Sequence, residues 1–251
     1  MALVTGVSRR AGIGYATARR LASYGASVFV HHYVRHDASQ PWGAEPDGPA
    51  AVVAGIREVS DAGVADLSAD LASPTAPAEV VAAAVAEFGR LDILVCNHAR
   101  SGDGTLAEVD AALLDSHYAV NTRSSILLAK EFAARFSGSG GRIIFMTSGQ
   151  DLGPMRGEVA YAASKGALAS ITLTLADELA EAGITVNAVN PGPVDTGYAP
   201  PDVVAAVAEH FPAKRWGEPD DPARLIAWLA TDDARWITGQ VLNSEGGFRR
   251  W

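Results

Sequence analysis

The stretch TGVSRRAGIG at Thr5–Gly14 decides the fold that this sequence predicts. A short apolar run at 2–5 leads into it, and a helical pattern begins at Ile13. A glycine-rich turn between a strand and a helix directs backbone N–H groups and the positive end of the helix dipole at an anion. Glycine allows close approach because it carries no Cβ. The stretch therefore indicates a nucleotide-binding loop, with a simple glycine turn as the alternative.

The rest of the chain alternates short apolar runs with longer helical patterns. The apolar runs lie at 2–5, 27–30, 64–68, 92–97, 142–148, 185–191 and 240–244. The helical patterns include 13–24, 80–88, 113–136 and 159–181. Continuous apolar runs are typical of strands buried on both faces, and their alternation with helices predicts a parallel sheet covered on both sides. We therefore expect one α/β domain over 1–251, a Rossmann-type doubly wound sheet of about seven strands.

Two segments are expected to lie outside this framework. The segment 33–49 is polar and rich in proline and glycine, which predicts a long surface loop. The segment 195–216 combines prolines with a helical pattern, which predicts a mobile lid over a bound substrate. Asp221 and Pro222 are the expected N-cap and first residue of a later helix, and Gly183 is the expected stop of the helix before it.

The composition limits the classes of partner. The 251 residues carry a net charge of −9, and 48% of them are hydrophobic, which provides for a sizeable core. The negative charge argues against nucleic acid and anionic membrane surfaces as partners. Cys96, the single cysteine, excludes an intrachain disulfide and fits a reducing compartment, so we expect a cytoplasmic protein. No apolar run is interpreted as a membrane helix, and no metal site is expected.

A second group of residues indicates acid–base chemistry. Ser148 ends a predicted strand, and Tyr161 and Lys165 lie four residues apart in YAASK on a predicted helix. That spacing puts Tyr161 and Lys165 on one helical face, and ligands bind at the carboxyl ends of strands in open α/β sheets. An ammonium beside a phenol would lower the phenol pKa and make Tyr161 a proton donor or acceptor near neutral pH. The alternative is that Tyr161 packs in the core and Lys165 is a solvated charge.

The motifs together resemble the short-chain dehydrogenase/reductase family over nearly the whole chain, most of all its 3-oxoacyl-thioester (acyl carrier protein) reductase branch. The motifs that carry the resemblance, in the family's order, are TGVSRRAGIG, CNHA at 96–99, Asn121 in YAVNTRSS, Ser148, YAASKGAL from Tyr161, NPGPVDT at 190–196 and ITGQVLNSEGG at 237–247. The resemblance implies a nicotinamide cofactor, a small carbonyl or alcohol substrate and the interconversion of a ketone and a secondary alcohol.

The resemblance also implies a role for each catalytic residue. Tyr161 would be the general acid in reduction and the base in oxidation, and Ser148 would orient and polarise the carbonyl. Lys165 would bind the nicotinamide ribose and tune Tyr161, and Asn121 would hold a water in a proton relay. The implied cofactor-binding residues are Gly6, Ser8, Arg9, Arg10, Gly12, Ile13, Gly14, His32, Asp70, Leu71, Asn97, Ala99, Tyr161, Lys165, Pro191, Gly192, Val194 and Thr196.

The sequence departs from the family at two places. Arg10 and Ala11 enlarge the glycine loop, and Cys96, His98 and Ala99 replace the family's Asn, Ala and Gly. We expect Ala99 to shift the adenosine ribose slightly, and His98 to be a strand-end histidine, with a ligand contact as the alternative.

The choice between NAD and NADP depends on the charge of the residue at the end of the second predicted strand. An acidic residue there would accept from the ribose 2′-hydroxyl and select NAD. His32 occupies that position, and Asp37 is expected to lie out in the loop. Arg9 or Arg10 would fit a 2′-phosphate, with Arg35 a further candidate, so we expect NADP, with NAD open if the arginines are surface charges.

The sequence thus predicts an NADP(H)-preferring oxidoreductase. The alternatives are an NAD-linked alcohol dehydrogenase of the same family and a dinucleotide-binding sensor without turnover. Residues 150–158 and the predicted lid are expected to select the substrate. The resemblance implies a homotetramer, for which the helices at 111–136 and 158–181 and the C-terminal stretch ending in Trp251 are candidate interfaces.

Overall fold

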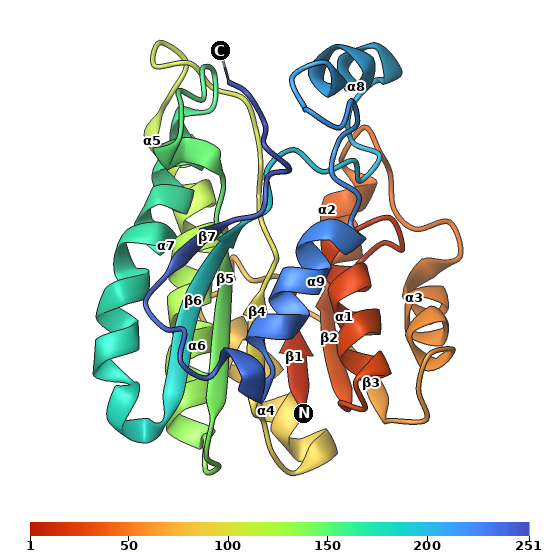
Figure 1. Cartoon of the computed structure of the whole chain (residues 1–251), viewed down its shortest axis with the longest axis vertical. Coiled ribbons are helices and arrows are strands. Elements are labelled where there is room, and N and C mark those ends of the chain that lie inside the picture. Colours follow the sequence, from red (N-terminus) through yellow and green to blue (C-terminus); the bar gives the residue numbers. More distant parts are fainter. Residues whose placement is uncertain (251) are drawn as a thin grey trace.

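The computed structural model describes residues 1–250, and its seven strands form one parallel sheet (Figure 1). The strands are β1 (Ala2–Val4), β2 (Val28–His32), β3 (Val64–Ser68), β4 (Ile93–Cys96), β5 (Gly141–Met146), β6 (Ile184–Asn190) and β7 (Val241–Asn243). Their order is β3-β2-β1-β4-β5-β6-β7, and every neighbouring pair is parallel. The predicted doubly wound sheet is therefore confirmed, with its change of direction beside β1.

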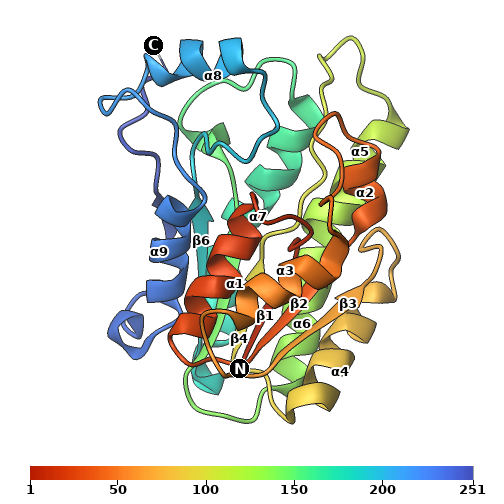
Figure 2. The same cartoon turned by 90° about the vertical axis from the view of Figure 1, so that its right-hand side faces the viewer.

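Helices cover both faces of this sheet (Figures 1 and 2). One face carries α1 (Ile13–Ser23), α3 (Gly48–Arg57) and α9 (Asp220–Leu229); the other carries α4 (Ala76–Phe88), α6 (Ser124–Arg135) and α7 (Val159–Glu178). Successive strand residues point to opposite faces, so each strand contributes to two cores. In β1, Ala2 and Val4 pack toward the first set of helices and Leu3 toward the second. Burial on both sides explains why the strands are continuous apolar runs.

The predicted helices differ from the observed ones in two places. Within 33–49, the structure forms α2 (Val34–Ala38) and the start of α3, so the prediction of a plain surface loop was wrong there. The single helix predicted at 113–136 is instead three consecutive segments, α5 (Ala111–His117), a π-helical segment at Tyr118–Arg123, and α6. A π turn holds one extra residue, which a periodicity of 3.6 does not reveal.

Two helix ends, at Gly183 and at the start of α9, can be compared with the caps predicted from the sequence. Gly183 adopts a φ of 71° after the short 3₁₀ turn that follows α7, as expected of a left-handed stop. Asp221 is not the N-cap of α9: the helix begins at Asp220, two residues before the expected Pro222, with Pro219 in the cap position.

The long helix α7 meets the length and composition of a membrane span, although no apolar run in the sequence was interpreted as one. In the structure this helix lies against the sheet, with buried residues along the facing side. Core helices of this kind pass the same test, because a helix that covers a sheet is apolar over much of its surface. The finding is therefore weak support for a membrane helix.

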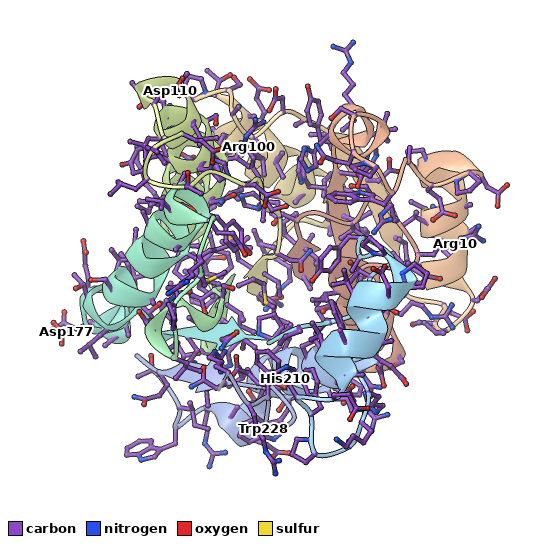
Figure 3. All side chains as sticks on the ribbon, turned by 90° about the horizontal axis from the view of Figure 1, so that it is seen from above. Arg10, Arg100, Asp110, Asp177, His210 and Trp228 are labelled. Carbon is purple, nitrogen blue, oxygen red and sulfur yellow. The ribbon has the colours of Figure 1, made fainter. Side chains whose placement is uncertain are left out.

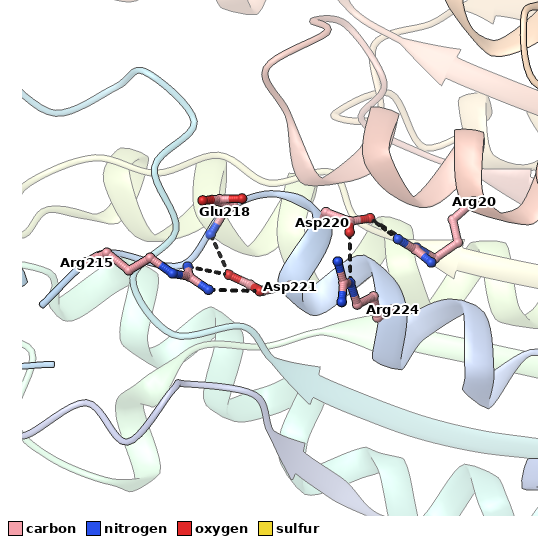
Figure 4. A network of polar contacts seen from close by, with 6 residues as sticks. All are labelled: Arg20, Arg215, Glu218, Asp220, Asp221 and Arg224. Atoms are coloured by element: carbon pink, nitrogen blue, oxygen red, sulfur yellow. Dashed lines mark hydrogen bonds and ion pairs between the residues drawn. The ribbon is translucent and has the colours of Figure 1, made fainter. Parts of the chain in front are cut away.

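The segment between β6 and α9 passes over the carboxyl ends of the strands and includes α8 (Pro201–Ala208) (Figure 1). Figure 4 shows how the end of this segment is attached to the body of the protein. Arg215 donates to the Asp221 carboxylate, with 2.7 Å from Nη1 to Oδ2. The neighbouring Asp220 forms ion pairs with Arg20 of α1 and Arg224 of α9. These contacts fix the C-terminal end of the segment, while none of the α8 residues is buried.

Candidate active site

A cleft of about 1310 Å³ opens at the carboxyl ends of the strands. Its walls come from the segments after β1, β2, β3, β4, β5 and β6 and from the C-terminal tail. The residues predicted from the sequence that line it are Gly6, Ser8, Arg9, Gly12, Ile13, Asp70, Leu71, Asn97, Ala99, Ser148, Tyr161, Pro191, Gly192, Val194 and Thr196. Asn121 and Lys165 are buried, and these two, with Arg10, Gly14 and His32, do not line the cleft.

The glycine loop is built by close backbone packing. Gly6 has a φ of +71°, and a Cβ on it would lie 2.7 Å from the His98 Cα. A Cβ on Gly14 would lie 2.6 Å from both the Asn97 Nδ2 and the Gly6 oxygen. Asn97 Nδ2 in turn donates to the Thr5 oxygen at 3.1 Å and to the Gly6 oxygen at 3.0 Å. Glycine at both positions, and the amide of Asn97, are therefore needed to form the loop itself.

The loop ends at the start of helix α1, which carries no side-chain cap. Gly12 occupies the N-cap position in extended conformation, and no side chain accepts a hydrogen bond from the first turn. Gly12 and Ile13 both line the cleft. Free N–H groups at a helix start attract an anion. The Gly12 N–H donates to the Arg9 oxygen at 3.1 Å, so the N–H groups left for an anion are those of the first turn from Ile13 onward, and these fit the pyrophosphate of a dinucleotide.

Ser148 and Tyr161 meet at the other end of the cleft. Ser148 follows β5, and Tyr161 lies in the first turn of α7. Burial raises the pKa of Tyr161, the nearby carboxylate of Glu158 raises it further, and a hydrogen bond with Ser148 lowers it. A tyrosine with a raised pKa is protonated at neutral pH, as a proton donor must be.

Lys165 lies behind Tyr161 and is 1% exposed. Its Nζ donates to the Met146 oxygen at 2.8 Å and lies 5.7 Å from the centroid of the Tyr161 ring. Burial lowers the pKa of Lys165 to about 8. The expected lowering of the Tyr161 pKa by Lys165 is not found here, because the ammonium faces the ring and bonds a backbone oxygen.

Asn121 lies in the π-helical segment and is fully buried. Its Oδ1 accepts from the Arg100 N–H at 2.6 Å, and its Nδ2 donates to the Arg100 oxygen at 2.9 Å and to Ser164 Oγ at 2.9 Å. Ser164 Oγ donates to the backbone carbonyl oxygen of Tyr161 at 2.8 Å. Asn121 thus connects the cleft wall after β4 to the helix that carries Tyr161 and Lys165. Its role in a water relay stays a prediction.

The end of β2 differs from the expected register. His32 is buried and turned out of the cleft, with its Nε2 3.0 Å from Asp66 Oδ2. His31 lines the cleft instead, because neighbouring strand residues point to opposite faces. The Gly6 N–H donates to His31 Nδ1 at 3.3 Å, and His31 Nε2 lies 2.9 Å from the Ala69 oxygen. Burial lowers the pKa of His31 to about 4, so His31 is neutral at pH 7.

The two arginines of the glycine loop have different environments. Arg10 forms ion pairs with Glu45 and Asp47, at 2.6 and 2.7 Å, and lies at the periphery of the view onto the strand ends (Figure 3). The prediction that Arg10 contacts the cofactor is therefore not supported by its position. Arg9 does line the cleft, and its Nη2 donates to the Thr196 oxygen at 2.6 Å.

Several residues around Arg9 were missed by the sequence reasoning. The Arg9 guanidinium lies 5.6 Å from the centroid of the Trp42 ring, and its Nε is 3.7 Å from Asp37 Oδ1. Trp42 also donates to Asp37 at 3.1 Å and packs edge-on against Tyr198 at 6.4 Å between ring centroids. Asp37 is thus buried at the cleft, where the sequence placed it in a loop. The aromatic residues within 33–49 and 195–216 are the feature of the sequence that could have predicted this cluster around Arg9.

The C-terminal tail also reaches the catalytic end of the cleft. Glu245, Phe248 and Arg250 line it, and Arg250 Nη1 donates to Glu245 Oε2 at 2.9 Å. The Asn190 amide at the end of β6 donates to the same carboxylate at 2.7 Å. The motif at 237–247 was recognised in the sequence, but it did not predict that the residues after it would line the cleft.

A glycine loop at an uncapped helix start, with a serine and a tyrosine in the same cleft, defines a dinucleotide-dependent oxidoreductase of Rossmann type. Residues 6–249 match the family model described as Enoyl-(Acyl carrier protein) reductase. The oxidoreductase YjdA of Bacillus subtilis is 46% identical over 253 residues, covering 100% of this chain and 97% of that protein. The chain belongs to the short-chain dehydrogenase/reductase family.

Solved structures agree with this assignment. A short-chain dehydrogenase/reductase from Serratia marcescens superposes with a TM-score of 0.88 at 36% identity, covering 98% of this chain and 96% of that one. A short-chain dehydrogenase from Burkholderia cenocepacia, solved in complex with NADP, superposes with a TM-score of 0.87 at 36% identity, with the same coverage.

Proposed function

We propose that this protein is an NADP(H)-preferring oxidoreductase that interconverts a ketone and a secondary alcohol. The observation that carries the proposal is that the glycine loop, Ser148 and Tyr161 line one continuous cleft. The nicotinamide cofactor would supply or accept the hydride. A carbonyl placed between the two hydroxyls would be polarised by Ser148 and protonated by Tyr161.

The lysine and the asparagine support this chemistry from behind the cleft. Lys165 holds a buried positive charge close to the Tyr161 ring. That charge does not lower the pKa of Tyr161 in this arrangement, and Lys165 instead bonds the Met146 oxygen at the end of β5, the strand that leads to Ser148. Asn121 fixes the backbone of Arg100 and, through Ser164, the first turn of α7. Both residues therefore serve the protonation step without lining the cleft.

The preference for NADP(H) rests on the charges near the end of β2. His31 and Tyr33 line the cleft there, and neither is a carboxylate that would select a ribose 2′-hydroxyl. Arg9 and Arg35 line the cleft nearby and offer guanidinium groups for a 2′-phosphate. The Burkholderia cenocepacia relative is named as an NADP complex, which supports the same choice. Asp37 is the competing carboxylate, but Arg9 and Trp42 already contact it.

A paired titration with NADPH and NADH at fixed salt tests the cofactor preference. We expect NADPH to bind more tightly, and Arg9→Ala to weaken NADPH by about tenfold while leaving NADH within twofold. Arg10→Ala is the matched control from the same loop, because its side chain pairs with Glu45 and Asp47 outside the cleft. Equal affinity for both cofactors, or equal effects of the two variants, would favour an NAD-linked dehydrogenase.

Turnover is tested with Tyr161→Phe. The probes are NADPH with ethyl 3-oxobutanoate, a β-keto ester, and with 4-nitrobenzaldehyde, followed by the loss of absorbance at 340 nm. We expect the variant to bind NADPH normally and to lose at least 99% of turnover, since the phenol is the proton donor. Turnover that persists in Tyr161→Phe contradicts the mechanism. A wild-type protein that binds NADPH but turns over neither probe points to the sensor alternative for these two classes of carbonyl.

We also propose a homo-oligomer, with a tetramer as the expected state. Leu114 on α5, Tyr118 in the π-helical segment and Leu173 on α7 are 40%, 53% and 65% exposed. α5 and α7 lie side by side in Figure 1 and contact each other, so these apolar groups occur on neighbouring elements. Light scattering after size-exclusion chromatography gives the mass. A monomer at micromolar concentration would contradict the proposal, and Leu173→Glu is expected to shift the mass downward.

A further inference from the structure

His98 lies directly after β4, between the glycine loop and the π-helical segment. The side chain is buried, with 7% of the residue exposed. The backbone of His98 is packed against the loop so closely that a Cβ on Gly6 would come within 2.7 Å of its Cα.

The two ring nitrogens of His98 contact different elements of the site. Nε2 lies 3.0 Å from the Val120 backbone oxygen and 2.6 Å from Ser124 Oγ. The Val120 oxygen can only accept, so this contact is a hydrogen bond in the tautomer that carries the proton on Nε2. The same oxygen also accepts from the Ser124 hydroxyl. In that tautomer Nδ1, 2.6 Å from Thr5 Oγ1, accepts from the Thr5 hydroxyl, which has the Val95 oxygen as a second acceptor at 3.2 Å. Burial lowers the pKa of His98 well below 6.5, which agrees with a neutral ring.

The two sides of the ring reach two parts of the proposed site. Thr5 is the first residue of the glycine loop, and its backbone carbonyl oxygen accepts from the side-chain amide of Asn97. Val120 immediately precedes Asn121, whose side chain bonds Arg100 and Ser164. A π-helical turn has weaker internal hydrogen bonding than an α-helix, so an outside donor to its carbonyl has more influence on its position.

We propose that His98 is a positioning residue, which holds the Val120 carbonyl through Nε2 and thereby sets the place of Asn121 in the site. The same ring contacts Thr5 of the glycine loop. His98 therefore connects the loop that would bind the cofactor with the segment that carries Asn121. This inference rests on the proposed function for its consequence in catalysis. The link itself is a property of the folded chain.

Two substitutions separate the two nitrogens of His98. Asparagine places its oxygen near the position of Nδ1, so His98→Asn keeps an acceptor for Thr5 and loses the donor to Val120. Glutamine places its amide nitrogen near the position of Nε2, so His98→Gln keeps the donor and loses the acceptor. His117→Asn is the matched control, because His117 is buried in the same helical run and its Nδ1 donates to a different backbone oxygen, that of Leu113, at 2.9 Å.

The first readout is kinetic, with NADPH and the two carbonyl probes. We expect His98→Asn to lower kcat about tenfold, which corresponds to about 1.4 kcal/mol, with the Kd of NADPH within threefold. We expect His98→Gln and His117→Asn to retain kcat within threefold of the wild type. Equal loss in the Asn and Gln variants, or an unchanged kcat in His98→Asn, would overturn the proposal.

The second readout does not need turnover. Amide hydrogen exchange of residues 118–124 is compared in the wild type and the three variants. We expect faster exchange only in His98→Asn, since only that variant removes the ring N–H from the Val120 carbonyl, which then keeps the Ser124 hydroxyl as its one side-chain donor. Unchanged exchange in this variant overturns the link even if its kcat falls. If the wild type turns over no probe, the proposed function fails, and the exchange measurement still decides whether His98 holds this segment.

Discussion

Lys165→Met is expected to stabilise the folded protein while it removes turnover. The residue is 1% exposed, and burial lowers its pKa from 10.5 to about 8. Each pKa unit corresponds to about 1.4 kcal/mol, so the buried ammonium costs the fold roughly 3 kcal/mol at pH 7. Methionine has a similar length and no charge. Loss of the hydrogen bond to Met146 offsets about 1 kcal/mol of this, which leaves a net gain of about 2 kcal/mol.

The stability of the wild type depends on pH because the pKa of Lys165 is lower in the folded protein than in the unfolded chain. Below pH 8 both states of the wild type carry the proton at Lys165, and the full cost is present. Between about 8 and 10.5 the unfolded chain binds more protons than the folded one, so wild-type stability rises with pH. The advantage of Lys165→Met should therefore shrink across that interval.

Urea unfolding followed by tryptophan fluorescence, at pH 7 and at pH 10, measures both effects. Lys130→Met is the control, because Lys130 is exposed on α6 and its change should alter stability by less than about 0.5 kcal/mol. A Lys165→Met protein that is less stable than the wild type at pH 7 would refute the reasoning. So would a difference that is the same at both pH values.

Three further predictions concern the loop and the buried titratable groups. Gly14→Ala puts a Cβ 2.6 Å from Asn97 Nδ2 and the Gly6 oxygen, so we expect a loss of about 1–3 kcal/mol of stability in urea and weaker NADPH binding by fluorescence; an unchanged Kd contradicts this. Burial raises the pKa of Cys96 to about 12, so the folded protein should not react with Ellman's reagent at pH 8 and should release one equivalent in urea. As the pH falls from about 6.5 to about 4, the unfolded chain binds a proton that folded His31 does not, and roughly 3 kcal/mol of stability is lost. His31→Gln should flatten that part of the stability curve, and a curve of unchanged slope would assign the loss to other groups.

The fold could be predicted from the sequence because strand burial leaves a direct mark on it. Each observed strand lies within two residues of a predicted apolar run, since a strand covered on both faces needs apolar residues throughout. The π-helical segment and α2 were missed for local reasons. The first has the composition of the α-helix around it, and the second is a short polar turn of helix among prolines and glycines.

The candidate site was predictable where position follows from topology and not where it follows from side-chain direction. Ser148 and Tyr161 line the cleft as expected, because both come from elements that end or begin at the carboxyl edge of the sheet. His32 was misplaced by one residue, and one residue along a strand reverses the face. Arg9 and Arg10 are neighbours in the chain, and only the fold of 33–49 separates the one in the cleft from the one paired with Glu45.

The π-helical turn at Tyr118–Arg123 determines how this part of the chain tolerates a change of length. A deletion of one residue there would let the helix close into regular α geometry and would improve its own hydrogen bonding. The same deletion would rotate one side of the helix by about 100° about its axis relative to the other. Asn121 would leave its partners although the secondary structure survived. The number of residues in this helix is therefore constrained by the orientation that Asn121 must have relative to the rest of the helix, and not by the stability of the helix itself.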